Sequence, residues 1–149
     1  MKRFLALLAM VSIILTAFSV QCFAGNTTDT VFNFKLPKEG YYSVVNSGRK
    51  KLDDTSSYVH YYSSNTGKVY FSIHGYDNIT FSHINQITNC TINDSAIIHP
   101  GQQRRIRQLV YERGFDYAFL GGAPSTGRGN TYITGVWSPD CAGTYPAAN

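Results

Sequence analysis

Three histidines lie in strand-like segments of the chain, and histidine is the side chain that most often binds metals or transfers protons near neutral pH. The segments are residues 58–63, 68–76 and 79–87. Turn-forming residues connect them, SNTG at 64–67 and DN at 77–78, so we predict a three-stranded antiparallel meander. The histidines of this meander are expected to share one sheet.

The expected register of the meander brings these histidines to one face. With a three-residue loop at 65–67, His60 lies opposite Ser72, and with a two-residue loop at 77–78, Ser72 lies opposite His83. His74 shares the face of Ser72 because side chains alternate along a strand. Three imidazoles on one face are ligands that suit Zn²⁺ or Cu²⁺. However, His60 and His83 would be two strand spacings apart, about 9–10 Å, which is too far for one ion.

Tyrosines surround these histidines. The chain has 11 Tyr, 9 Phe and 1 Trp, more aromatic residues than the core of a domain this small needs. Amphipathic rings favour contact surfaces for sugars, peptides or proteins, so a binding face is one interpretation. Packing of tyrosines against each other across strands is the simpler interpretation. The candidate face consists of Tyr58, His60, Tyr62, Tyr70, Ser72, His74 and His83, and further tyrosines lie nearby in the sequence at Tyr41, Tyr42 and Tyr61.

No segment carries a motif typical of nucleophilic or metal-dependent hydrolysis. The sequence has neither G-x-S-x-G nor H-E-x-x-H. The glycine-rich segment 121–130 lacks the G-K-[ST] ending of a phosphate-binding loop, so we expect a hairpin connection there. The acidic residues stand mostly in turn-like contexts, and nothing in the sequence brings two of them together. We predict no catalytic residues, no metal site and no cofactor.

The N-terminus has the three parts of a secretory signal peptide. Two basic residues precede an apolar segment, residues 4–20, and a small residue, Ala24, follows it. We expect cleavage between Ala24 and Gly25, which would leave residues 25–149 as a secreted, extracellular chain. The apolar segment is short for a transmembrane helix, and polar sequence follows it at once, so an uncleaved anchor is the weaker alternative.

Cleavage of the signal peptide would also remove Cys22, leaving two of the three cysteines, Cys90 and Cys141. Oxidising compartments favour paired cysteines. We predict a Cys90–Cys141 disulfide, which would close a loop of about 50 residues and contribute roughly 4 kcal/mol in the chain-entropy model. Two buried free thiols are the alternative.

The charge of the mature chain argues against nucleic-acid binding. Of the 13 basic side chains 11 remain after cleavage, against 9 acidic ones, a net charge of +2. The one dense basic cluster is Arg104, Arg105 and Arg107. A solvated face of a strand or helix explains this cluster most simply, and attraction to an anionic envelope polymer is the alternative.

Short strand-like segments separated by turn residues extend through the mature chain. The clearest alternation is at 31–36, where Phe32, Phe34 and Leu36 share a face. Residues 90–98 fit an irregular segment or a short strand, and residues 102–113 fit either a helix or a strand. This pattern predicts an all-β fold with a single antiparallel β-sandwich domain. Beside the meander, the expected strands are residues 31–36, 41–45, 115–120 and 131–138.

Both ends of the chain resemble a family of small secreted proteins from Gram-positive bacteria. The segment 24–34 resembles that family's AGNTTDT-x-F-x-F start, and residues 130–139 resemble its terminal NTY…G-x-W-x-P strand. The family is distantly similar to small secreted bacteriocins with a β-sandwich fold. The resemblance therefore implies export and an all-β fold, and it favours a strand at 102–110. It carries no catalytic residues to this chain.

Together these features favour a non-enzymatic exported protein that acts by contact at the cell envelope. Its partner would be a cell-wall polymer or, if the protein is a bacteriocin-like effector, a surface protein of another cell. A small secreted hydrolase with an unrecognised site is the alternative, and a pocket joining a histidine to an acidic residue would favour it. A structural or immunity-type partner protein is a third possibility.

Overall fold

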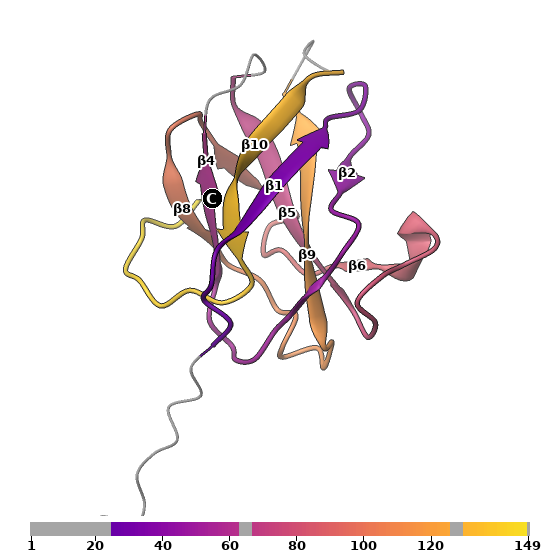
Figure 1. The fold of residues 1–149 in the computed structure, drawn as a ribbon, viewed down its shortest axis with the longest axis vertical. Coiled ribbons are helices and arrows are strands. Elements are labelled where there is room, and N and C mark those ends of the chain that lie inside the picture. Colours follow the sequence, from indigo (N-terminus) through magenta and orange to yellow (C-terminus); the bar gives the residue numbers. More distant parts are fainter. Residues whose placement is uncertain (1–24, 63–66, 126–129, 149) are drawn as a thin grey trace, which may run out of the picture.

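The computed structural model describes residues 25–62, 67–125 and 130–148, and these fold as two antiparallel β-sheets packed face to face (Figure 1). The predicted all-β sandwich is thereby confirmed. The first sheet has the strand order β1-β10-β4-β8, and the second has the order β2-β9-β5-β6, with β3 pairing with β9 and β7 pairing with β5. The elements are β1 (Thr30–Lys35), β2 (Ser43–Val44), β3 (Arg49–Lys50), β4 (Ser57–Tyr61), β5 (Val69–Tyr76), the 3₁₀ helix η1 (Ile84–Gln86), β6 (Thr88–Asn89), β7 (Ala96–Ile98), β8 (Gln103–Ile106), β9 (Tyr117–Pro124) and β10 (Tyr132–Ser138).

The strand β1 shows how the sequence pattern fixes one face. Phe32 and the following Leu36 are buried in the core, whereas Val31 is 69% exposed, as the alternation at 31–36 predicts. This strand pairs along its whole length with β10, from Thr30 opposite Trp137 to Lys35 opposite Tyr132. Strands from the two ends of the described chain therefore lie side by side in the first sheet (Figure 1).

Aromatic side chains from both sheets meet in the core. The rings of Tyr61 on β4 and Phe71 on β5 pack edge to face, with centroids 5.5 Å apart. Phe32 on β1 packs against the same Phe71 ring at 5.8 Å. Edge-to-face packing is a favourable arrangement for aromatic rings, and burial of these large apolar surfaces is the main force joining the sheets.

The predicted hairpin between residues 58–63 and 68–76 is wrong. Strand β4 pairs with β10 and β8 in the first sheet, whereas β5 pairs with β9, β6 and β7 in the second. Apolar alternation tells which face of a strand is buried but not which strand lies beside it. Here Tyr61 and Phe71 meet across the core instead of along a hydrogen-bonded ladder. Residues 64–66 of the predicted turn lie outside the described residues.

Other predicted segments differ at their edges or in type. Residues 79–87 do not form the third strand of a meander: they contain η1, and His83 precedes that helix. The segment 102–113, which fitted either helix or strand, contains β8 followed by turns. Strand β9 runs four residues further than expected, because Gly121 and Gly122 continue the pairing with β5.

The predicted Cys90–Cys141 disulfide is absent, and both residues are free thiols in the structure. Cys90 is buried beside β5, with its Sγ 3.4 Å from the carbonyl oxygen of Thr88. Cys141 follows β10 and is partly exposed, with its Sγ 3.4 Å from the carbonyl oxygen of Gly143. An even number of cysteines indicates that pairing is possible, but the fold places these two sulfurs in different contacts.

The predicted signal peptide, residues 1–24, lies outside the described residues. Within the described ranges, no helix is both long enough and apolar enough to cross a bilayer.

Candidate binding pocket

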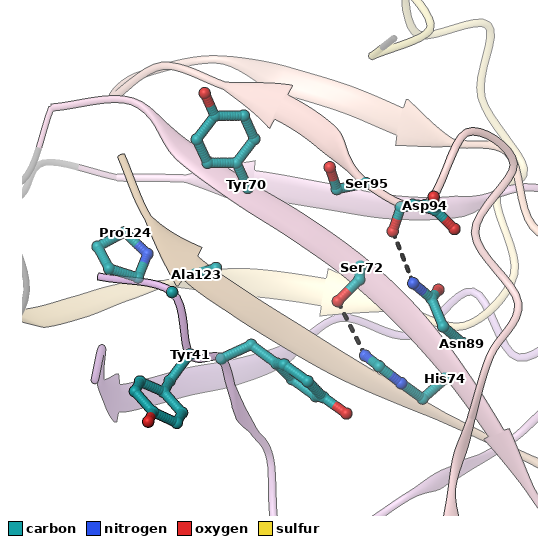
Figure 2. A pocket seen from close by; sticks show the side chains of 11 residues that line it. Tyr41, Tyr70, Ser72, His74, Asn89, Asp94, Ser95, Ala123 and Pro124 are labelled. Atoms are coloured by element: carbon teal, nitrogen blue, oxygen red, sulfur yellow. Dashed lines mark hydrogen bonds between the residues drawn. The ribbon is translucent and has the colours of Figure 1, made fainter. Parts of the chain in front are cut away.

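A pocket of about 430 Å³ lies on the outer face of the second sheet. Residues from four parts of the chain form it: the segment before β2, strand β5, the loop from β6 to β7, and the end of β9 (Figure 2). The lining residues are Gly40, Tyr41, Tyr42, Tyr70, Ser72, His74, Asn89, Asp94, Ser95, Ala123 and Pro124.

Strand β5 supplies the floor of the pocket through strict alternation. Val69, Phe71 and Ile73 belong to the core, so the side chains between them face away from the core. The outward side chains are Tyr70, Ser72 and His74. All three also line the pocket, so the structure brings together three of the seven residues of the candidate face.

A glycine on the neighbouring strand β9 leaves room for the side chains at the floor of the pocket. Gly121 on β9 is the direct partner of Ser72 on β5 and of Val44 on β2. A Cβ atom at Gly121 would lie 2.6 Å from Ser72 Oγ and 2.9 Å from His74 Nε2, closer than side chains tolerate. A glycine inside a strand often marks such a close approach. Its neighbour on the same face, Ala123, is also small.

Ser72 and His74 are joined by a hydrogen bond of 2.9 Å between Oγ and Nε2. Figure 2 shows this pair at the floor of the pocket. The His74 side chain is 2% exposed, and burial lowers its pKa to about 4. The imidazole is therefore neutral at pH 7, with one nitrogen that donates and one that accepts.

The second ring nitrogen of His74 is the exceptional atom of the pocket. Nδ1 is buried and has no hydrogen-bond partner in the described part of the chain. A buried polar atom without a partner costs about 1–3 kcal/mol, so native proteins rarely leave one unless water or a ligand satisfies it. His74 Nδ1 is therefore an unsatisfied polar atom enclosed beneath the pocket lining, beside the Ser72–His74 hydrogen bond.

Tyr42 covers His74 from the far side of β9. The two rings are stacked, with centroids 5.1 Å apart and an angle of 8° between their planes. A turn before β2 brings the tyrosines here: Tyr41 N donates to Lys38 O at 3.2 Å, and Gly40 has a φ of 87°, which glycine adopts readily. Tyr41 is 69% exposed at the rim.

The loop opposite the tyrosines is held by Asn89. Its Nδ2 donates to the carbonyl oxygen of Asp94 at 2.8 Å, and its Oδ1 accepts from the backbone N–H of Thr91 at 2.9 Å. Asn93 and Asp94 have φ values of 66° and 65°, a left-handed conformation that Asn and Asp tolerate better than most residues. This wall gives the pocket amide, hydroxyl and carboxylate groups.

The other four residues of the candidate face do not lie on this face of the second sheet, so their expected placement beside Ser72 is wrong. His60 is on β4 of the first sheet, where its ring packs edge to face on Tyr62 at 4.6 Å. Tyr58 is buried beneath Tyr145, with ring centroids 4.5 Å apart, and burial raises the pKa of Tyr58 to about 12. His83 is exposed before η1. The cause is the misassigned hairpin, which had placed β4 and β5 in one sheet.

The sequence reasoning missed Tyr42, Asn89 and Asp94 as site residues. Tyr42 belongs to the tyrosine-rich first half of the chain, and that surplus was the available signal. Asn89 and Asp94 resemble ordinary turn residues, and only the tertiary structure brings their loop to β5.

Chemically, the pocket offers a Ser–His pair together with tyrosine rings and a carboxylate in its lining. A Ser–His pair resembles part of a hydrolytic triad, but the third member of a triad is an acid that hydrogen-bonds the far nitrogen and stabilises the imidazolium. His74 Nδ1 has no such bond within the described residues. The lowered pKa of His74 also makes it a weak base at neutral pH. In the same part of the chain, no group of three or more His, Cys, Asp or Glu is arranged to hold a metal ion.

Comparisons with known proteins add a family but no described activity. A family model described as a protein of unknown function (DUF2712) matches residues 20–141. Comparison with curated proteins gave no match, and comparison with solved structures gave none. Because the family model spans most of the chain, the protein belongs to the DUF2712 family of proteins of unknown function.

Proposed function

We propose that this protein is exported and acts without catalysis, as a contact module that binds sugars of a cell-wall polymer in the pocket on its second sheet. The observation that carries the proposal is the floor of this pocket, where the neutral imidazole of His74 is held between Ser72 and the stacked Tyr42 ring. Export rests on the signal-peptide pattern of residues 1–24.

The chemistry of the lining fits a carbohydrate ring. Tyrosine rings such as the exposed Tyr41 offer apolar faces with a polar edge, which suits the alternating apolar and hydroxyl surfaces of a sugar. Ser72, Asn89 and Asp94 supply hydroxyl, amide and carboxylate groups for the sugar hydroxyls. A cavity of about 430 Å³ lies within the usual range for small-molecule sites.

Co-sedimentation with purified Gram-positive cell walls tests the proposal, followed by titration with soluble wall fragments released by a muramidase. We expect wild-type protein to bind and Tyr42→Ala to bind roughly tenfold more weakly, the effect of about 1.4 kcal/mol. Tyr62→Ala is the matched control, because Tyr62 is 39% exposed against 44% for Tyr42 and belongs to the other sheet. Equal binding by both variants, or no binding by wild type, would contradict the proposal.

A second function, hydrolysis, has one observation in its favour: the pocket joins Ser72 and His74 with the carboxylate of Asp94 in its lining. A fluorophosphonate probe, which labels activated serines, distinguishes the two functions. We expect no labelling, because the unpartnered Nδ1 leaves His74 a weak base. Labelling that disappears in Ser72→Ala would establish a hydrolase instead.

A bacteriocin-like effector would also act by contact, but on cells other than the one that produces it. This version rests on the resemblance of the two chain ends. Growth of neighbouring Gram-positive cells in the presence of purified mature protein tests it. Inhibition that Tyr42→Ala weakens would place the same pocket in that role, whereas inhibition unaffected by Tyr42→Ala would indicate another surface.

A further inference from the structure

Gly25 lies directly against two carboxylates. A Cβ atom at this position would collide with Asp53 Oδ2 and would lie 2.7 Å from Asp140 Cβ. The next residue, Asn26, donates its backbone N–H to Asp140 Oδ2 at 2.5 Å, which fixes the direction of the chain. A side chain at residue 25 would therefore displace these acids. The Cα atom of Gly25 lies beside both of them, and the backbone nitrogen of Gly25 is bonded to that Cα atom.

These two acids share one ammonium group. Lys51 forms an ion pair with Asp140 in which both side chains are fully buried, and it lies 3.4 Å from Asp53 Oδ1. Lys51 Nζ also donates to the carbonyl oxygen of Thr55 at 2.7 Å. Two carboxylates share this one ammonium group: Lys51 and Asp140 are fully buried, and the Asp53 side chain is 22% exposed, so part of the second negative charge is removed from water.

The charge of the nearby Arg49 faces both Asp29 and Asp140, while its hydrogen bonds go to other groups. Its guanidinium donates to the carbonyl oxygens of Thr28 and Trp137 and, at 2.7 Å, to Asn26 Oδ1. The remaining charged neighbour, Asp29, is a further acid near Arg49. Counting all five groups, three carboxylates face two cations.

The two carboxylate oxygens of Asp53 have different neighbours. Its Oδ1 accepts from the backbone N–H and the hydroxyl of Thr55, at 2.9 and 2.5 Å. Burial alone would raise the pKa of Asp53, but the hydrogen bonds from Thr55, the charge of Lys51 and a hydrogen bond with the Asp140 side chain lower it below its usual value. Asp53 is thus ionised at neutral pH, with Oδ2 toward Gly25.

We propose that removal of the signal peptide creates the missing cation: the free α-ammonium of Gly25 pairs with Asp53 and Asp140 and completes this cluster. Hydrolysis of the Ala24–Gly25 peptide bond by the leader peptidase of the export machinery consumes one water. It turns a neutral amide nitrogen into an ammonium group and leaves a carboxylate on Ala24. The inference rests on the exported part of the proposed function, and it makes cleavage a step that stabilises the fold.

The structural consequence is a link between three parts of the chain. Gly25 precedes β1, Asp53 lies between β3 and β4, and Asp140 follows β10. An uncleaved chain has an uncharged N–H at Gly25 and lacks this ion pair. The mature chain is therefore expected to be more stable than any chain that continues before Gly25.

The test compares wild-type protein, exported and processed by a Gram-positive host, with a variant carrying two serines inserted between Ala24 and Gly25. Intact mass identifies the first residue of each secreted chain: Gly25 in wild type and serine in the insertion variant. We expect the insertion to shift the unfolding equilibrium roughly tenfold toward the unfolded state, seen as a lower urea midpoint. That shift corresponds to a rise of about one unit in the α-amino pKa of Gly25.

Direct titration of the Gly25 α-amino group by NMR gives the second measurement. The facing groups are Asp53, Asp140 and Asp29 on the acidic side and Lys51 and Arg49 on the basic side. We expect a pKa above the usual range of about 7.7–8.0. Because the folded-state pKa is raised, the added stability is present below the unfolded pKa and is lost as pH rises through the folded pKa.

Charge variants separate the ion pair from general effects. Asp53→Asn should lower the α-amino pKa and should destabilise the wild-type chain more than the chain with the insertion. Asp54→Asn is the matched control, since Asp54 is the exposed neighbour of Asp53. Equal urea midpoints for wild type and insertion variant, or an ordinary α-amino pKa, would overturn the inference. A secreted chain that begins at a residue other than Gly25 would also overturn the inference, because Gly25 would then not carry the α-ammonium group. Wall binding through Tyr42 is measured separately.

Discussion

Gly121 lies directly opposite Ser72 on the paired strands β9 and β5, and the space where its side chain would stand is occupied by the Ser72–His74 hydrogen bond. The absence of one side chain thus leaves room for the Ser72–His74 pair at the floor of the pocket.

The first prediction concerns this glycine. Gly121→Ala should cost about 1–3 kcal/mol of folding free energy, because its methyl group must displace Ser72 or His74. It should also abolish wall binding, since the pocket floor moves. Gly122→Ala is the contrasting variant: its Cβ would lie 3.0 Å from Phe34 on the core side, so stability should fall while binding is retained. Urea unfolding and co-sedimentation measure both effects, and retained binding by Gly121→Ala would contradict the account of the pocket.

The second prediction concerns the pH dependence of stability through His74. Burial lowers its folded-state pKa to about 4, against 6.5 in the unfolded chain. The unfolded state therefore binds the proton more readily, so stability is complete above about pH 6.5 and falls as pH drops toward 4. The loss is on the order of 3 kcal/mol.

Urea unfolding between pH 4 and pH 7 checks this slope. His74→Gln should flatten it, because glutamine does not titrate. An identical slope in wild type and His74→Gln would show that other groups cause the pH dependence.

The third prediction concerns the packing between the sheets. Phe71 is fully buried and contacts both Tyr61 and Phe32. Phe71→Ala should destabilise the fold by about 3–5 kcal/mol, through lost burial and the cavity left behind. Val31→Ala is the control, because Val31 is 69% exposed and should change stability by less than about 0.5 kcal/mol. Comparable effects of the two substitutions would contradict the assignment of the core.

The fourth prediction concerns the two cysteines. Both are free thiols, with Cys141 partly exposed and Cys90 buried. Burial raises the pKa of Cys90 and so reduces its thiolate fraction and its reactivity. Iodoacetamide should alkylate Cys141 in the native protein and Cys90 only after unfolding. A secreted protein whose mass is lower by two hydrogens, with no alkylation in denaturant, would restore the disulfide predicted from the cysteine count.

The alternation of apolar and polar residues was enough to predict the fold class and the buried faces of β1 and β5. Alternation placed Phe32 and Leu36 in the core, and it placed Tyr70, Ser72 and His74 on a single face. These are local properties, because a strand turns its side chains to opposite faces whatever lies beside it.

Which strands are neighbours depends on how the whole chain packs. The composition of the pocket depends on it too, because its residues come from neighbouring strands and loops. The pattern of residues 58–63 and 68–76 predicts a hairpin, but the two segments belong to different sheets, so His60 is not beside Ser72. His83 is not beside Ser72 either, because residues 79–87 contain η1 instead of the expected third strand. The partner of Ser72 is Gly121, almost 50 residues away, and the covering ring is Tyr42. Strand pairing and the sulfur contacts of Cys90 and Cys141 depend on the packing of distant segments around a shared core. No periodicity within a single segment encodes that choice.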